Sequence, residues 1–456
     1  MTGGLKARVR RVDLHDMRSR SVPALTLGLA MVAALVTTAF GAPPSAAAVP
    51  PLSVRVAGNA LVDEQGAPVR LLGVNRAGTE YACAQGWGHF DGPVDASALS
   101  RIASWGGNAV RVPLNESCWL GTGGVSTTWG GASYRTAIRE YVQRLHGAGM
   151  LVVLDLHWAA PGDRLATGQI KMADADNAPA FWRSVATAFK DDTAVIFDVY
   201  NEPHDISWAC WRDGCTTSDG YQAVGMQGLV DAVRSTGALQ PILINGMNYG
   251  GDLSQWLEHA PVDPAGQLVA GAHLYDFSQC NTVACWDATI APVAARVPVI
   301  TGEVGQSRCA RDWVDTYLDW ADARGISYTA WTWNTWDCGG GPALISDYDG
   351  TPTAFGVGVK ERLLKHAAAL PAPAPSPAPV PAPAPTPTPA PASPSPSPTA
   401  TVAPGPSPSP TATAAPSPSP TLKAPRTKRP RAVVTPLRAS ARPVAAPVRT
   451  RKAVRR

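Results

Sequence analysis

Two glutamates, Glu202 and Glu303, are the residues of this sequence best suited to catalysis. Glu202 stands in Asn201-Glu202-Pro203 and Glu303 in Gly302-Glu303, and each follows a short apolar run. A pair of carboxyls can hydrolyse a sugar acetal, because one protonates the leaving oxygen while the other attacks the sugar carbon or activates water. To divide this work, their surroundings must drive their pKa values apart. The pair therefore predicts acid/base chemistry at an acetal.

The elements that must position these carboxyls alternate between strands and helices. Segments with helix-like composition and apolar spacing cover residues 132–148, 177–189, 219–235 and 310–324. Eight short β-branched or apolar runs predict strands at 69–74, 109–113, 151–156, 195–200, 241–245, 269–274, 297–301 and 327–333. Eight strand–helix units predict a (β/α)8 TIM barrel, with a doubly wound sheet as the alternative. A β-hairpin over 52–70 is expected to close the barrel floor.

Polar and aromatic residues stand at the carboxyl ends of six predicted strands, where a barrel carries its catalytic groups. These ends are Arg111, Asp155-Leu156-His157-Trp158, Asn201-Glu202-Pro203-His204, His273-Leu274-Tyr275, Gly302-Glu303-Val304-Gly305 and Trp331-Thr332-Trp333-Asn334. One polar strand end is commonly structural, whereas six predict a shared site. Strands four and seven lie across the barrel opening. A carboxyl separation of about 5–5.5 Å there would give retention through a covalent glycosyl-enzyme.

Taken in order, these stretches carry a family resemblance. The chain resembles glycoside hydrolase family 5 over residues 52–366 in Arg111-Val112-Pro113, Asp155-Leu156-His157, Asn201-Glu202-Pro203, His273-Leu274-Tyr275, Gly302-Glu303 and Trp331-Thr332-Trp333-Asn334. The resemblance implies Glu202 as the general acid/base and Glu303 as the nucleophile. It also implies substrate-binding or supporting roles for Arg111, His157, Asn201, His273, Tyr275 and Trp333.

The resemblance assigns each supporting residue a task. Asn201 would bind the 2-hydroxyl of the reacting sugar, and Arg111 with Tyr275 would hold Glu303 charged and oriented. The two histidines would line the same subsite.

Two assignments in this region stay open. Trp333 would form the apolar floor beneath the sugar, but Trp331 lies two residues away and would share its side of the strand. Glu80 and Glu116 follow strands one and two, match no motif of the family, and are interpreted as loop or subsite residues.

Substrate class rests on weaker signals. Tryptophans are frequent in the predicted loops, and aromatic faces stack on sugar rings, which favours a β-linked polymer. The stretch 201–205 with the Cys-Trp-rich loop after it is similar to bacterial endo-β-1,4-glucanases, and this favours a secreted cellulase. The alternatives are β-mannan, another β-glucoside or a glycolipid as substrate. A cell-surface carbohydrate-binding protein on an inactive barrel is disfavoured by the two intact glutamates.

No cofactor or metal is expected, because the sequence shows no C-x-x-C or clustered Cys/His spacing and no EF-hand loop.

The composition of the 456-residue sequence changes along the chain and indicates its domain boundaries. All 15 Trp and all 8 Cys fall between Cys83 and Cys338, and no aromatic residue follows Leu370. We therefore predict one catalytic domain over 49–366, a Pro/Ala/Ser/Thr-rich linker over 367–422 and a disordered basic tail over 423–456. This distribution argues against a large multidomain protein and against a polytopic membrane protein.

The N-terminus predicts secretion. A basic stretch, an apolar run over 24–40 and Ser45-Ala46-Ala47-Ala48 indicate a signal peptide over 1–48, cleaved after Ala48, with an uncleaved membrane anchor as the alternative. Secretion makes disulfides the default for eight cysteines. The short spacings favour Cys210–Cys215 and Cys280–Cys285, and we pair the remaining four as Cys83–Cys118 and Cys309–Cys338.

Charge is distributed unevenly along the chain. Residues 1–48 carry +4 and residues 423–456 carry +12, which leaves 21 basic and 33 acidic residues between them, a net −12. An acidic domain disfavours nucleic acid as a partner. The basic tail is expected to bind an anionic cell surface, with a merely solvated tail as the alternative, and we expect a monomer.

Overall fold

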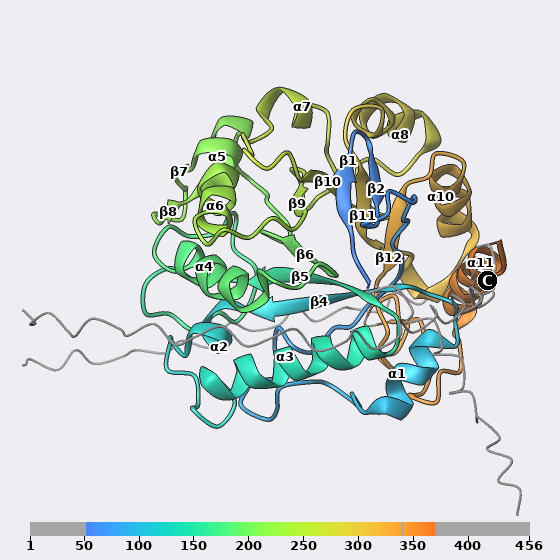
Figure 1. Ribbon diagram of the computed structural model, residues 1–456, viewed down its shortest axis with the longest axis horizontal. Coiled ribbons are helices and arrows are strands. Elements are labelled where there is room, and N and C mark those ends of the chain that lie inside the picture. The colour runs from blue at the N-terminus through green and yellow to red at the C-terminus, as the bar shows by residue number, and fades with distance from the viewer. Residues whose placement is uncertain (1–51, 340, 370–456) are drawn as a thin grey trace, which may run out of the picture. The chain divides into compact units, whose positions relative to one another are not determined.

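A closed barrel of eight parallel strands forms the centre of the computed structural model, which describes residues 52–339 and 341–369 (Figure 1). The strands are β3 (Leu72–Asn75), β4 (Ala109–Asn115), β5 (Leu151–Trp158), β6 (Val195–Asp198), β9 (Ile242–Asn245), β10 (Leu268–Tyr275), β11 (Val299–Gly305) and β12 (Ser327–Ala330). They follow one another around the barrel in chain order, and β12 pairs with β3 to close it. Each predicted run overlaps a strand. The (β/α)8 prediction is confirmed and the doubly wound alternative is wrong.

Helices follow the strands and cover the outside of the barrel (Figure 1). They are α1 (Ala96–Ala103), α2 (Glu116–Leu120), α3 (Ala132–Gly147), α4 (Ala178–Phe189), α5 (Trp208–Asp213), α6 (Gly225–Arg234), α7 (Trp256–His259), α8 (Val283–Thr289), α9 (Ala291–Ala294), α10 (Asp312–Asp322) and α11 (Ala354–Ala369), with a short 3-10 turn at Ser307–Cys309. The four predicted helices correspond to α3, α4, α6 and α10. The helix expected from 219 begins only at Gly225, because β7 (Cys215–Thr216) and β8 (Gln222–Ala223) pair ahead of it.

Side-chain alternation determines what the barrel interior holds. In β5 the even-numbered positions 152, 154 and 156 are apolar and pack with the helices. Leu151 and Val153 lie in a separate apolar layer inside the barrel. The next inward positions are Asp155 and His157, both buried. The same change from apolar to polar on other strands builds a buried polar layer at the carboxyl end of the barrel: Asn75, Arg111, Asp198, Asn245 and His273.

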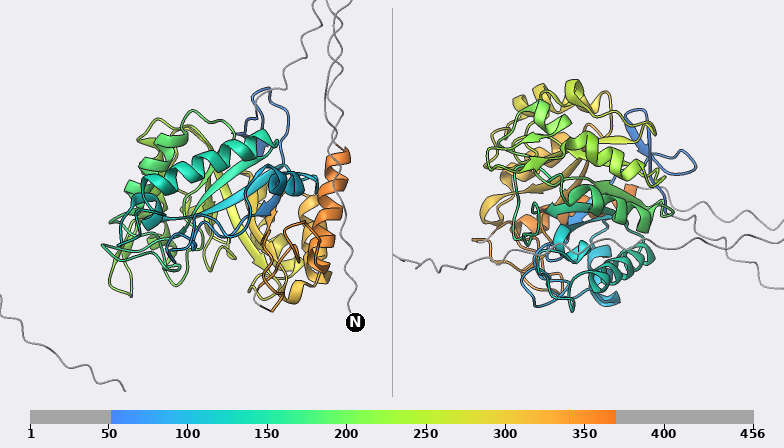
Figure 2. Two further views of the ribbon diagram at one scale, coloured as in Figure 1. Left: turned by 90° about the horizontal axis from the view of Figure 1, so that it is seen from below. Right: turned by 90° about the vertical axis from the view of Figure 1, so that its left-hand side faces the viewer.

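The N-terminal hairpin closes the other end of the barrel. It consists of β1 (Arg55–Ala57) and β2 (Ala60–Val62), drawn in blue at one end of the molecule in Figure 2. Val54 and Leu61 are buried against the inner apolar layer, which includes Leu151 and Ile196. The predicted floor is confirmed.

Four disulfides join the cysteines in the predicted pairs: Cys83–Cys118, Cys210–Cys215, Cys280–Cys285 and Cys309–Cys338. Each involves loops that follow a strand, so all four restrain the face that carries the polar layer.

The predicted signal peptide and basic tail lie outside the described residues, as do residues 370–422 of the predicted linker. The predicted domain end at 366 falls inside α11, which continues to Ala369. No helix within 52–339 and 341–369 is long and apolar enough to cross a membrane.

Candidate active site

Arg111 is the centre of the polar layer. It projects inward from β4 and is fully buried. Its guanidinium lies 3.0 Å from Asp155, 2.9 Å from Asp198 and 2.9 Å from Glu303. Five fixed N–H donors allow one guanidinium to serve several carboxylates at once. Arg111 thereby joins strands β4, β5, β6 and β11 beneath the site.

Burial sets the protonation of this layer. It raises the pKa of Asp155 to about 7, although Arg111 opposes the shift. It raises the pKa of Asp198 well above its ordinary value for the same reason. Burial also acts to lower the pKa of Arg111, but the three carboxylates more than offset it and leave that pKa above its ordinary value. The guanidinium therefore stays charged.

Glu303 receives two donors on its two oxygens. Arg111 Nη1 donates to Oε1 at 2.9 Å, and the Tyr275 hydroxyl donates to Oε2 at 2.5 Å. With one donor on each oxygen, the orientation of the carboxyl group is fixed. The side chain is only 5% exposed, so few other groups compete for it.

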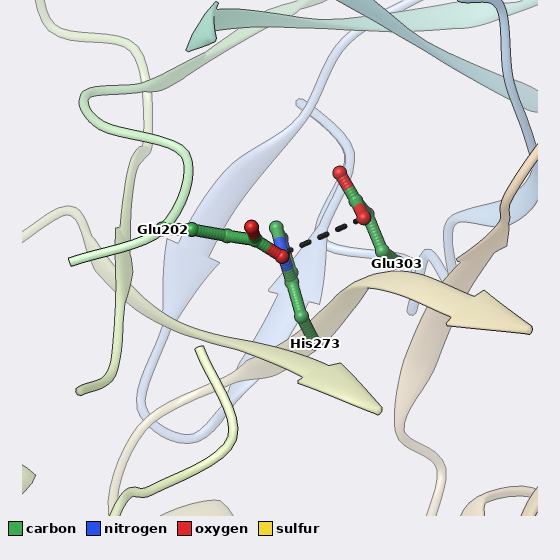
Figure 3. A group of neighbouring side chains, drawn as sticks. All are labelled: Glu202, His273 and Glu303. Atoms are coloured by element: carbon green, nitrogen blue, oxygen red, sulfur yellow. Dashed lines mark hydrogen bonds and ion pairs between the residues drawn. The ribbon is translucent and has the colours of Figure 1, made fainter. Parts of the chain in front are cut away.

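Glu202 faces Glu303 across His273, as Figure 3 shows. His273 Nδ1 lies 3.0 Å from Glu202 Oε1 and 3.7 Å from Glu303 Oε2. One carboxyl oxygen of Glu202 and one of Glu303 lie within 4.8 Å of each other. Burial lowers the pKa of His273 to about 3 and raises the pKa of Glu202. The two glutamates thus have unequal surroundings, because burial shifts Glu202 towards its acid form and two donors bind Glu303. Such a difference is what a division of roles in acid catalysis requires.

Asn201 and His157 complete the polar wall. The Asn201 Oδ1 atom accepts a hydrogen bond from Arg111 at 2.8 Å, and its Nδ2 is buried without a partner among the described residues. That amide is a donor left for a ligand. His157 Nδ1 lies 2.6 Å from Asp155, and the His157 ring stacks on Trp331 at 5.4 Å. Burial lowers the pKa of His157 to about 4.

The aromatic floor differs from the prediction. Trp331 lines the cleft, whereas Trp333 is 2% exposed and packs edge-on against Trp105 at 4.7 Å. The sequence argument assumed that both tryptophans belong to one strand. The strand β12 ends at Ala330, so alternation does not extend to them. Of the two tryptophans, Trp331, the open alternative, is therefore the one that lines the cleft.

A cleft of about 820 Å³ contains both glutamates and runs beyond them. The sequence did not single out Gln169, Tyr249 or Phe277 at its walls. They stand in loops after strands, where no periodic pattern marks them. Four of the eight predicted site residues line the cleft: His157, Glu202, Tyr275 and Glu303. Arg111, Asn201 and His273 lie behind them, joined to the two glutamates by the contacts described above, and Trp333 belongs to neither group.

Glu80 and Glu116 do not line this cleft. Glu80 is buried near Asp155, and burial raises its pKa to about 8. Glu116 is buried beside Asp174, and each carboxyl has a buried oxygen, Glu116 Oε1 and Asp174 Oδ2, with no donor among the described residues. A proton shared between the two carboxyls would satisfy both oxygens. Burial, with Asp174 as a further cause, raises the pKa of Glu116 well above its ordinary value.

This carboxyl pair predicts a pH-dependent stability. The contribution of Glu116 is fully present below its unfolded pKa and is lost as pH rises through the higher folded pKa. In Glu116→Gln the amide would donate to Asp174 without a titrating proton. The wild-type protein should lose unfolding free energy between pH 5 and pH 9, and we expect this loss to be smaller in Glu116→Gln by about 1–3 kcal/mol. Urea unfolding would measure it beside the exposed control Glu140→Gln, and an unchanged pH slope would contradict the shared proton.

Glu202, His273 and Glu303 also form the one group in the described part of the chain whose spacing could hold a metal ion. Each already has a protein partner in the arrangement above, since His273 Nδ1 contacts both carboxyls and Tyr275 contacts Glu303. Proton transfer between the carboxyls and a bound sugar needs no further ligand.

Known glycosidases are similar to this chain in sequence. The chain is similar to endoglucanase CelA of Streptomyces lividans (27% identity; 68% of this chain, 64% of the relative). It is also similar to endoglucanase MaCel5A of Microbulbifer sp. (26%; 62% and 54%) and to a mannan endo-1,4-beta-mannosidase of Salipaludibacillus agaradhaerens (26%; 61% and 80%). The chain thus spans between about half and two thirds of the length of the two endoglucanases.

Solved structures share the fold. The β-glucanase SdGluc5_26A from Saccharophagus degradans, in complex with cellotetraose, superposes with a TM-score of 0.55 at 22% identity, over 69% of this chain and 94% of that one. A family model for cellulase (glycosyl hydrolase family 5) matches residues 62–337, which is more than half of the sequence. With the barrel and the paired glutamates, this match shows that the chain belongs to glycosyl hydrolase family 5.

Proposed function

We propose that the protein is a secreted, retaining endo-β-1,4-glucanase with Glu202 as acid/base and Glu303 as nucleophile. The observation that carries the proposal is the carboxyl pair itself. Its oxygens approach within 4.8 Å, Glu202 is biased towards the acid by burial, and Glu303 accepts two donors. Close carboxyls are typical of retaining enzymes, because inverting enzymes need room for a water molecule.

In the first step, Glu303 attacks the anomeric carbon while Glu202 gives its proton to the glycosidic oxygen. The bond to the leaving sugar breaks, and an ester forms between Glu303 and the sugar. The unpartnered Asn201 amide is positioned to donate to the 2-hydroxyl, and Trp331 offers an apolar face to the ring. The hydrogen bonds of Arg111 and Tyr275 orient the attacking carboxylate.

In the second step, Glu202 takes a proton from water, and the resulting nucleophile attacks the same carbon. The ester bond to Glu303 breaks and the carboxylate is restored. Two inversions leave the product with the configuration of the substrate.

Substrate choice is supported by the cleft and by the relatives. Aromatic rings line the cleft around the catalytic pair: Tyr249, Tyr275, Phe277, Trp331 and Trp336. A cleft with several exposed aromatic rings suits a polymer of stacked sugar rings. Relatives named as endoglucanases favour β-1,4-glucan, and the mannosidase relative makes β-mannan the second candidate.

Secretion is supported by the N-terminal sequence and by four disulfides, which persist in oxidising compartments. The twelve basic residues of 423–456 would hold the enzyme near an anionic cell surface through long-range attraction.

The test uses full-length protein from an oxidising host. We expect it to release reducing ends from carboxymethylcellulose and mixed-linkage β-glucan, and to form the β-anomer first when cello-oligosaccharide hydrolysis is followed by proton NMR. Activity on mannan alone would keep the mechanism and overturn the substrate. Early α-anomer would overturn the double displacement, and silence on all polymers would favour a binding protein.

Substitutions of Trp331 and Trp333 should have different effects, one on activity and the other on stability. Trp333→Ala should lower the unfolding free energy by about 3–5 kcal/mol, because it empties a buried site against Trp105. Trp331→Ala should leave unfolding close to wild type and lower kcat/KM on cello-oligosaccharides by about tenfold. Thermal unfolding and steady-state kinetics on both variants would check this. The reverse pattern would restore Trp333 as the sugar platform.

A further inference from the structure

Phe277 is an aromatic residue of the cleft wall that the reaction steps above do not use. It stands two residues after β10 and is 71% exposed, the largest exposed fraction of any large apolar side chain in the described part of the chain. Its ring stacks on that of Tyr275, with centroids 5.0 Å apart and planes 12° from parallel. The Tyr275 hydroxyl in turn donates to Glu303 Oε2 at 2.5 Å. Phe277 is therefore in contact with a residue that holds the proposed nucleophile.

The loop around Phe277 is fixed by hydrogen bonds on both sides of it. Tyr275 N–H donates to Ser278 Oγ at 3.1 Å, and Ser278 N–H donates to the Tyr275 carbonyl at 3.0 Å. Asp276 Oδ1 accepts hydrogen bonds from the N–H and the hydroxyl of Ser307, both at 2.9 Å. Ser307 follows β11, the strand of the proposed nucleophile. The loop is thereby tied to that strand, and its backbone places the exposed Phe277 ring.

Two neighbours restrict the Tyr275 ring. Tyr275 pairs with Gly305 across β10 and β11, and a Cβ added at Gly305 would lie only 2.9 Å from Tyr275 Cε1. The stack with Phe277 is the second restraint. Burial, with Glu303 as a further cause, raises the pKa of Tyr275 well above its ordinary value, so the hydroxyl keeps the proton that it donates. The ring is thus confined in a position that places its hydroxyl donor on the carboxyl of Glu303.

We propose that Phe277 is a positioning residue, whose ring fixes that of Tyr275 so that the Tyr275 hydroxyl stays on Glu303 throughout the reaction. The inference rests on the proposed glycosidase function, because it assigns a task beside the proposed nucleophile. A donor that is fixed in advance acts on a charge without reorganising during the reaction. The hydroxyl would orient the carboxylate for attack in the first step, and would stabilise the charge that returns to it in the second.

The test is a double-mutant cycle, measured as kcat on β-cellobiosyl fluoride, which has no sugar on the leaving side. Phe277→Ala should lower kcat by about five- to tenfold, the range that the loss of one aromatic contact allows, with KM within about twofold of wild type. Tyr275→Phe keeps the ring and removes the hydroxyl. In that background Phe277→Ala should change kcat by less than about twofold, because the donor that Phe277 positions is already absent.

Two further variants and one stability measurement serve as controls. Phe277→Tyr keeps a ring at this position and should recover kcat to within about twofold of wild type. Val283→Ala shortens a side chain of 42% exposure in the following helix α8, outside the cleft lining, and should change neither kcat nor KM. Thermal unfolding of Phe277→Ala should stay close to wild type, because most of the side chain is exposed.

The other outcomes contradict the positioning role. If the effects of Phe277→Ala and Tyr275→Phe multiplied in the double variant, Phe277 would act independently of the Tyr275 hydroxyl. A raised KM at unchanged kcat would indicate a sugar contact instead, and an unchanged kcat and KM would leave Phe277 without a role in the reaction. A wild-type protein that does not hydrolyse the fluoride would overturn the proposed function, and the inference with it.

Discussion

Glu303→Gln should lower kcat on β-glucan by about 10⁴-fold or more, the scale expected when a covalent nucleophile is lost. The amide has the shape of the carboxylate but is too weak a nucleophile to form the ester. One of its two polar atoms can still accept a hydrogen bond from Tyr275 or Arg111, so the domain should remain folded. Affinity for cellotetraose, measured by calorimetry, should stay within about tenfold of wild type. Turnover within tenfold of wild type would contradict the assignment.

Azide rescue distinguishes the two glutamates. In Glu303→Ala, azide can occupy the space of the missing carboxylate and attack from its side, which gives an α-glycosyl azide. In Glu202→Ala, the nucleophile still forms the ester, and azide replaces water in the second step to give a β-glycosyl azide. Both variants should be assayed with β-cellobiosyl fluoride, whose departure needs little acid assistance. If Glu303→Ala gave the β-glycosyl azide and Glu202→Ala the α-glycosyl azide, the roles of Glu202 and Glu303 would be reversed.

The sequence was sufficient for the barrel because local patterns and fold agree there. Each strand is a short run of apolar residues, and in β5 the change from Leu151 and Val153 to Asp155 and His157 marks where the apolar interior ends and the polar layer begins. Strand ends converge in a parallel barrel, so residues far apart in sequence could be placed together.

Prediction failed where regular structure stops. The order of Trp331 and Trp333 depended on a strand that ends at Ala330. Tyr249 stands in an irregular loop whose backbone is fixed by contacts to Pro203 and His273, two partners that no local pattern reveals. The identity of these residues was visible in the sequence, but the direction of their side chains depends on tertiary contacts.

Removal of the Arg111 charge should cause the largest loss of stability of any single change at the site. In Arg111→Met, Asp155, Asp198 and Glu303 would lose their shared cation while remaining buried. We expect the unfolding free energy to fall by about 3–5 kcal/mol near neutral pH. Arg111→Lys should recover little, because one ammonium cannot contact three carboxylates in the geometry of the guanidinium. The activity of the molecules that remain folded should also fall, since Glu303 loses one of its two donors.

The pH dependence of this loss identifies its cause. Burial already raises the pKa of Asp155 and Asp198, and without the cation both would rise further. A carboxyl with a raised folded pKa stabilises the fold at low pH and ceases to do so as pH rises through that pKa. The deficit of Arg111→Met should therefore be smaller at pH 5 than at pH 8 in urea unfolding. Arg234→Met breaks a buried ion pair with Asp263 away from the cleft. Burial acts to raise the Asp263 pKa, but hydrogen bonds from Arg234 and from the backbone N–H groups of Gln267 and Ala265 leave that pKa below its ordinary value. Because the backbone donors remain in Arg234→Met, that control should not recover in the same way on acidification, and its kcat should match wild type. A deficit for Arg111→Met that does not change with pH would mean that lost packing, rather than the three uncompensated carboxylates, is responsible.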